Sequence, residues 1–196
     1  IDVWVNSNAD DVELFLNGKS LGKKDMPSNG HLQWNVKFEP GKLEAVAYKK
    51  GKKLKAKIET TNAAAEVVLT PYKTTMLADG KDATVINVTV VDKEGREVPD
   101  ADNMIKFNLA GDAKIIGVGN GDPSSHEPDK CADGAWQRHL FNGKCQIIFQ
   151  AGTKPGIIKF DAQAAGLLTG STDIAMVDTE SANTFTIDKN YELKGE

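Results

Sequence analysis

The stretch Val85–Gly95, VINVTVVDKEG, decides the fold class of this 196-residue chain. Its first seven residues alternate along an extended chain, so that Ile86, Val88 and Val90 point to one side and their neighbours to the other. Valine, isoleucine and threonine are typical of strands because their branched side chains pack well on a pleated surface. Lys93–Gly95 then has the composition of a hairpin turn. The stretch therefore predicts a β-strand that ends in a turn.

The same two-residue period runs through most of the chain. Residues 1–62 contain about six short alternating segments, among them Val12–Leu16, which leads into Asn17-Gly18, the strongest short signal for a hairpin. The following residues contain about seven more such segments, spaced 8–15 residues apart. No window of ten residues shows a convincing helical period. We therefore predict an all-β chain of two tandem immunoglobulin-like β-sandwich domains.

The domain boundary is expected in the short stretch Thr60–Ala65, which is rich in small residues. This assigns residues 1–62 to a small β-sandwich and residues 63–178 to a larger immunoglobulin-like domain. Residues 179–196 are polar and alternate weakly, which predicts a tail or a terminal strand. Charge supports the division, because the first domain carries +3 and the remainder −7 of a net −4.

Composition excludes several classes of protein. Hydrophobic residues make up 40% of the chain and charged residues 27%, as in ordinary globular domains. The chain has no apolar run long enough for a membrane span and no basic, aromatic face suited to nucleic acid. Cys131 and Cys145 are too few for a disulfide scaffold, so we expect free thiols, although an oxidising compartment leaves pairing open. With neither an initiator methionine nor a leader, we expect a piece of a longer polypeptide.

The strongest candidate for a functional segment is a long polar loop that follows the apolar residues of Ile115–Pro128, IIGVGNGDPSSHEP. Loops of this length are often functional. Asp122 and His126 are its candidates for contact with substrate. Within 120–139 seven side chains could ligate a metal, but their spacing matches neither a zinc finger nor an EF-hand, and we predict no metal site and no cofactor. The alternative is an ordered loop that packs on a neighbouring domain.

Aromatic and basic side chains offer two further candidates. Trp136 is the best candidate for stacking on a sugar, with burial against the sandwich as the alternative, while Trp34 has the pattern of a core residue and Trp4 could face either way. The lysines of 49–57 suit an anionic glycan or a membrane surface, or they protect an edge strand from pairing with other chains. We favour edge protection, since aromatic residues do not alternate with these lysines.

Several motifs in series resemble one enzyme family. VELFLNGKSLG at Val12–Gly22 and PGKLEAVAYKKGK at Pro40–Lys52 resemble the β-sandwich that follows the catalytic barrel of glycoside hydrolase family 2 enzymes. LADGKDATVINVTVVDKEGREVPDADNMIKFNLAG at Leu77–Gly111, then the loop stretch above and RHLFNG at Arg138–Gly143, resemble the C-terminal domain of the same enzymes. The resemblance implies a parent glycosidase of the β-galactosidase type, periplasmic or secreted, with the upstream catalytic domain as partner.

No catalytic residue can be carried over from that resemblance. The catalytic glutamates of the family lie on a TIM barrel, which needs about 250 residues of alternating strands and helices. The resemblance therefore implies a non-catalytic accessory region that braces the catalytic domain or shapes its substrate entrance. Two alternatives stay open. The first is a carbohydrate-binding module, in which the sandwich holds a glycan on an exposed aromatic platform. The second is a pair of tandem immunoglobulin-like domains of a bacterial surface adhesin.

Overall fold

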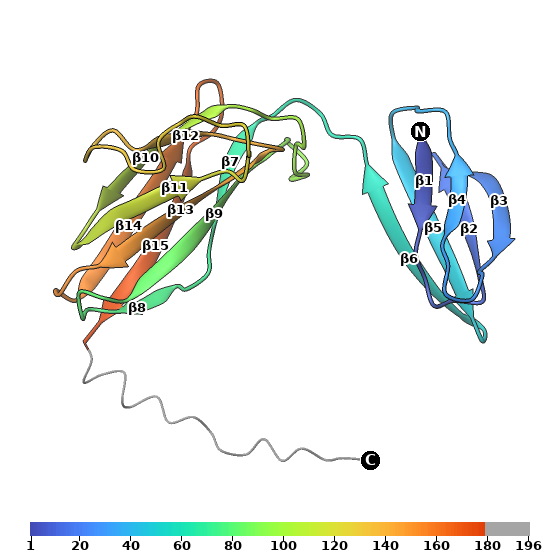
Figure 1. The fold of residues 1–196 in the computed structure, drawn as a ribbon, viewed down its shortest axis with the longest axis horizontal. Coiled ribbons are helices and arrows are strands. Elements are labelled where there is room, and N and C mark those ends of the chain that lie inside the picture. Colours follow the sequence, from blue (N-terminus) through green and yellow to red (C-terminus); the bar gives the residue numbers. More distant parts are fainter. Residues whose placement is uncertain (179–196) are drawn as a thin grey trace, which may run out of the picture. The chain divides into compact units, whose positions relative to one another are not determined.

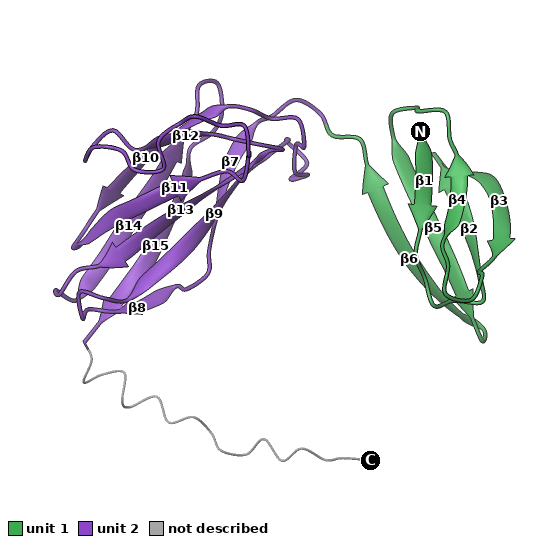
Figure 2. Ribbon diagram, in the orientation of Figure 1, with its two compact units in different colours: residues 1–61 green, residues 62–196 purple. Residues whose placement is uncertain are grey.

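The computed structural model describes residues 1–178, and every regular element in that range is a β-strand. The chain divides into two compact units, Ile1–Thr61 and a second unit that begins at Asn62 (Figures 1 and 2). The units meet one residue before the boundary expected from the sequence, and the expected tail or strand at 179–196 lies outside the described residues. Within 1–178 no helix has the length and apolarity that crossing a bilayer requires. The all-β prediction is confirmed.

Unit 1 contains six strands in two sheets of unequal size (Figure 1). The larger sheet has the order β3-β2-β5-β6, and the smaller pairs β1 with β4. Its core combines Val12 and Leu14 with Leu32, Trp34 and Val36, so Trp34 is the core residue that its pattern predicts. The bounds are β1 (Asp2–Val5), β2 (Asp11–Leu16), β3 (Lys19–Asp25), β4 (Leu32–Asn35), β5 (Lys42–Lys49) and β6 (Lys52–Glu59).

The hairpin between β2 and β3 forms where the sequence predicts it. Leu16 pairs with Lys19, which leaves Asn17 and Gly18 as a two-residue loop. Both have positive φ, 52° and 80°, the conformation that asparagine and glycine tolerate best. The Asn17 side chain also accepts a hydrogen bond from Lys42 N at 2.8 Å and donates one to Pro40 O at 3.0 Å. This residue therefore joins two turns of unit 1.

Unit 2 is a sandwich of a five-stranded sheet, β12-β10-β14-β15-β8, and a four-stranded sheet, β11-β13-β9-β7. It has nine strands where the sequence predicts about seven, because the short strands β8 and β12 have no clear period of their own. The bounds are β7 (Glu66–Pro71), β8 (Thr75–Leu77), β9 (Ala83–Val91), β10 (Met104–Ala110), β11 (Ala113–Gly119), β12 (Gln137–His139), β13 (Lys144–Ala151), β14 (Gly156–Gln163) and β15 (Gly170–Val177).

The core of unit 2 lies between these two sheets. Ile86, Val88 and Val90 of β9 are fully buried, as their alternation predicts, and β9 pairs with β7 on one side and β13 on the other. From the facing strands, Phe160 stacks near two other rings, with centroid distances of 5.9 Å to Phe107 and 6.3 Å to Phe149. Burial of this apolar surface is the main source of stability for the unit.

The turn after β9 is organised by a buried carboxylate. The Asp92 side chain has no exposed surface and accepts hydrogen bonds from the backbone N of Asn62 at 2.9 Å, from that of Arg96 at 2.9 Å and from Arg96 Nε at 2.8 Å. The hydrogen bond from the Arg96 guanidinium is the main cause that holds the pKa of Asp92 far below its ordinary value. Asp92 thus joins the first residue of unit 2 to its first hairpin.

Replacing Asp92 with asparagine is expected to lower the melting temperature of unit 2 at pH 7 by about 5 °C or more, since the ion pair with Arg96 is lost. A depressed pKa stabilises the fold above the ordinary aspartate pKa of about 3.9 and loses that contribution as the pH falls toward the folded-state pKa. The difference between wild type and Asp92→Asn should therefore shrink below about pH 4. Thermal melts from pH 2 to 8 measure this, with the exposed Asp100→Asn as control; a pH-independent difference would contradict it.

Candidate functional site

The long loop between β11 and β13 is held by a buried arginine. Arg138 lies in β12, and its side chain is only 5% exposed. Its Nη1 donates to Glu127 O at 3.0 Å and to Asp129 Oδ1 at 3.2 Å, and its Nη2 donates to Asn120 Oδ1 at 3.2 Å. A guanidinium suits this position because its planar fork can donate in several directions at once. Arg138 therefore links Asn120, near the start of the loop, to Glu127 and Asp129 farther along it.

Glu127 and His139 form a second link across the same loop. His139 Nδ1 lies 2.6 Å from Glu127 Oε1, and the backbone N of His139 donates to Oε2 at 3.1 Å. Partial burial opposes charge on Glu127, but the hydrogen bonds from His139 outweigh it and lower the pKa of the carboxyl. Glu127 is thus an ionised structural acceptor, whereas a catalytic acid would need a raised pKa.

The predicted site residues of this loop lie in different environments. Asp122 closes a local turn by accepting hydrogen bonds from Ser124 N at 2.8 Å and Ser124 Oγ at 2.7 Å, which lower its pKa. His126 is exposed. Trp136 is only 8% exposed and packs in the core of unit 2, so its ring offers no platform for a sugar. The structure therefore supports the burial alternative for Trp136 and shows Asp122 in a turn-forming role.

The exposed tryptophan is Trp4 on β1, which is 61% exposed. Its ring stacks on His31 with a centroid distance of 4.4 Å and an interplanar angle of 19°. The sequence left the direction of Trp4 open. In the structure Trp4 pairs with Gln33, and Val3 and Val5 on either side of it pack on the core. Since side chains alternate along a strand, Trp4 faces outward.

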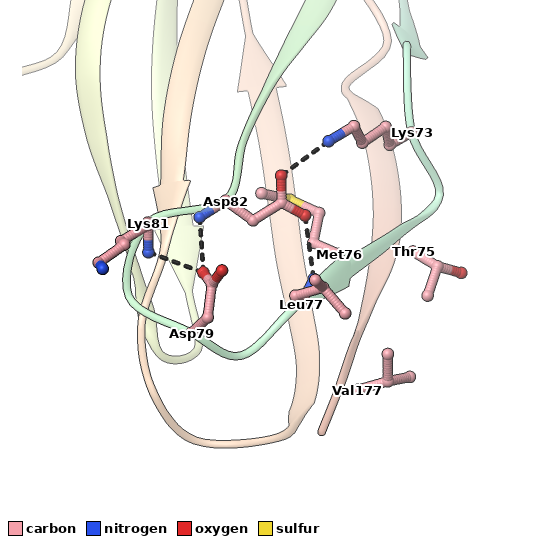
Figure 3. A pocket seen from close by; sticks show the side chains of 8 residues that line it. All are labelled: Lys73, Thr75, Met76, Leu77, Asp79, Lys81, Asp82 and Val177. Carbon is pink, nitrogen blue, oxygen red and sulfur yellow. Dashed lines mark hydrogen bonds and ion pairs between the residues drawn. The ribbon is translucent and has the colours of Figure 1, made fainter. Parts of the chain in front are cut away.

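A cleft of about 540 Å³ lies beside β8 and the end of β15 (Figure 3). Its two aspartates are engaged locally. Asp79 accepts from the backbone N of Lys81 at 2.8 Å and of Asp82 at 2.7 Å, and Asp82 accepts from Leu77 N at 3.0 Å and Lys73 Nζ at 2.7 Å (Figure 3). Backbone hydrogen bonds, chiefly from Asp82, lower the pKa of Asp79. Glycoside hydrolysis needs one carboxylic acid with a raised pKa facing a second carboxylate, and this pair does not supply it.

The two cysteines and the acidic side chains give no sign of metal chemistry in the described part of the chain. Both thiols are free, and burial raises the pKa of Cys145 to about 12. Residues 1–178 contain no group of three or more histidine, cysteine, aspartate or glutamate side chains arranged to hold a metal ion. In the 119–143 loop, Asn120, Asp122 and Glu127 take part in turns and in contacts with Arg138 and His139.

Comparison with known proteins places this structure among parts of much longer enzymes. A β-galactosidase of Bacteroides ovatus, BoGH2A, is 44% identical over 171 residues, which are 85% of this chain and 20% of that protein. A putative β-glucuronidase of Formosa agariphila is 35% identical over 164 residues, covering 79% of this chain and 15% of that protein. Of the solved structures, a glycosyl hydrolase family 2 member from Bacteroides cellulosilyticus has a TM-score of 0.82 at 34% identity, over 90% of this chain and 23% of its own.

The chain thus spans about a fifth of the length of these relatives. Residues 1–55 match a domain of unknown function, DUF4982. Residues 67–173, more than half of the chain, match the model of the glycoside hydrolase family 2 C-terminal domain 5. These matches confirm the resemblance seen in the motifs, and the chain belongs to the family of C-terminal domains of glycoside hydrolase family 2 enzymes.

Proposed function

We propose that this chain is a non-catalytic accessory region that braces the catalytic domain of a family 2 glycosidase or shapes its substrate entrance. The main support for the proposal is that the acidic side chains of the two candidate places already serve the fold. In the cleft of Figure 3 the carboxylates of Asp79 and Asp82 accept local hydrogen bonds, and in the candidate loop those of Asp122 and Glu127 do so. All four have lowered pKa values. Ionised carboxylates of this kind stabilise turns and do not serve as the general acid of a glycosidase.

The names of the relatives support a role in which this region does not determine the sugar specificity of the enzyme. A β-galactosidase and a putative β-glucuronidase share this region at 44% and 35% identity. If the region bound the reacting sugar, we would expect it to differ more between enzymes of different specificity. We propose that the parent activity is that of a β-galactosidase, as in the Bacteroides ovatus relative. A carbohydrate-binding module is less well supported, since Trp136, the candidate for stacking on a sugar, is buried.

The purified 196-residue chain is expected to release no nitrophenol from aryl β-galactosides or β-glucuronides above the buffer rate.

The same chain should contribute to the stability and activity of the longer enzyme. Removing it should lower the melting temperature of the catalytic domain by several degrees and reduce kcat/KM, because the surface it covers becomes exposed. Calorimetry and steady-state kinetics measure both effects. Hydrolysis by the isolated chain, or a truncated enzyme with unchanged stability and kinetics, would contradict the proposal.

A further inference from the structure

The two sheets of unit 1 leave part of its core side uncovered. A groove of about 260 Å³ opens between β1 and the strands β5 and β6. Aliphatic side chains dominate its lining, including Val3 and Val5 from β1 and Leu43, Ala56 and Ile58 from the larger sheet. Leu14, a core residue with 1% exposure, also borders the groove. The groove is therefore a lateral opening of the hydrophobic core of unit 1.

The apolar side chains of β6 lie on the core side of the sheet, and Ala56 and Ile58 line the groove. Leu54 pairs with Ala47 and Ile58 with Leu43, so both lie on the side of the sheet that carries the core. Yet Leu54 is 70% exposed and Ile58 69% exposed. Lysines occupy the alternate positions, and Lys55 pairs there with Glu44 at 3.3 Å. Strand β6 thus has the two-sided pattern of a strand buried on one face, but within unit 1 nothing covers that face.

Backbone groups beside the groove are also free to pair. Among residues 1–178, β1 forms its sheet with β4 alone, and β6 pairs with β5 alone. Each strand therefore presents an open edge, and open edges with an adjoining apolar face are the usual sites where an extended segment is added. A third strand beside β1 would extend the smaller sheet toward Ile58, which lines the same groove.

We propose that an extended apolar segment of the longer enzyme, from outside this chain, occupies this groove beside β1. The inference rests on the proposed function, and about four fifths of the length of the relatives lies outside the matched region. A second copy is disfavoured because unit 1 carries a net charge of +3, so two copies would repel. A sugar is disfavoured because, beside the exposed ring of Trp4, only Asn6 and Lys57 offer polar side chains for its many hydroxyl groups, and the rest of the lining is aliphatic. Lys57, the one lysine in the lining, fits a segment that carries an acid beside its apolar residues.

Thiol accessibility tests the occupant directly. Leu54→Cys and Ile58→Cys are made separately in a Cys131→Ser background, where the remaining Cys145 is buried and protonated. Both variants are expected to react with a maleimide at the rate of an exposed thiol in the 196-residue chain. In the longer enzyme their reaction should slow at least tenfold. Lys53→Cys, on the same strand but the opposite side, is the matched control and should react equally fast in both proteins.

Equal rates for Ile58→Cys, whose position lines the groove, in the chain and in the longer enzyme would overturn the inference. So would protection already present in the isolated chain: if it grows with protein concentration the occupant is a second copy, and if it does not the occupant is this chain's own remaining residues. These outcomes are separate from those of the proposed function, which rests on kinetics and stability after truncation. A protected groove with unchanged kinetics would retain the docking site and remove the bracing role.

Discussion

Replacing Phe160 with alanine is expected to lower the free energy of unfolding of unit 2 by about 3–5 kcal/mol. Phe160 has no exposed surface and lies between the rings of Phe107 and Phe149. Removing its ring loses the burial of an aromatic side chain and leaves a cavity that two sheets, fixed by their hydrogen bonds, can fill only in part. The melting temperature of unit 2 should fall by roughly 10–20 °C.

Calorimetry of the 196-residue chain measures this effect, since each unit has its own core and its transition can be followed separately. Ile157→Ala is the control, because Ile157 is the neighbour of a core residue on β14 but is itself 54% exposed. Its effect should stay within about 1 kcal/mol. A loss below 1 kcal/mol for Phe160→Ala would contradict the packing described for unit 2.

Replacing Arg138 with methionine is expected to lower the free energy of unfolding by about 2–4 kcal/mol, because it removes a buried guanidinium and takes a donor away from the Glu127 carbonyl and the Asn120 side-chain oxygen. Asn120 and Glu127 lose their hydrogen bonds to the guanidinium, and the loop between β11 and β13 loses the side chain that joins its ends. The same change should make the loop a new site of proteolysis.

Denaturant unfolding and limited proteolysis measure these two effects together. Arg138→Lys is the informative control, since it keeps the positive charge and loses the planar fork. It should recover less than half of the lost stability. Full recovery by lysine would mean that charge alone holds the loop, and no loss with methionine would mean that the loop is fixed by other contacts.

The sequence could predict those parts of the fold in which a local period and a tertiary position agree. The alternation of Ile86, Val88 and Val90 identified the buried strand β9, and Asn17-Gly18 identified the β2–β3 hairpin of unit 1, because both signals depend on neighbouring residues alone. Strands β8 and β12 were not predicted, since three residues carry too little period and their pairing partners are distant in the chain.

The candidate site was harder to predict because burial of a single side chain depends on the whole fold. Trp136 lies between Ala135 and Gln137 and Trp4 between Val3 and Val5, and these apolar or mixed neighbours do not by themselves show that the first is buried and the second exposed. The role of Arg138 requires the positions of Asn120 and Glu127, which lie more than ten residues away. A motif shared with a family indicated that this segment matters, but the contacts appear only in three dimensions.

The place of β15 in its sheet has a consequence for how unit 2 is made. In the order β12-β10-β14-β15-β8, the last described strand lies inside the sheet and pairs with β8, whose residues precede it by about a hundred positions. Unit 1, by contrast, closes its β2–β3 and β5–β6 hairpins between neighbours. During synthesis on a ribosome, short-range closures can form early, while non-local ones must wait for their partner. The second sandwich therefore stays incomplete until nearly its whole length has left the exit tunnel, when the first has already had time to fold.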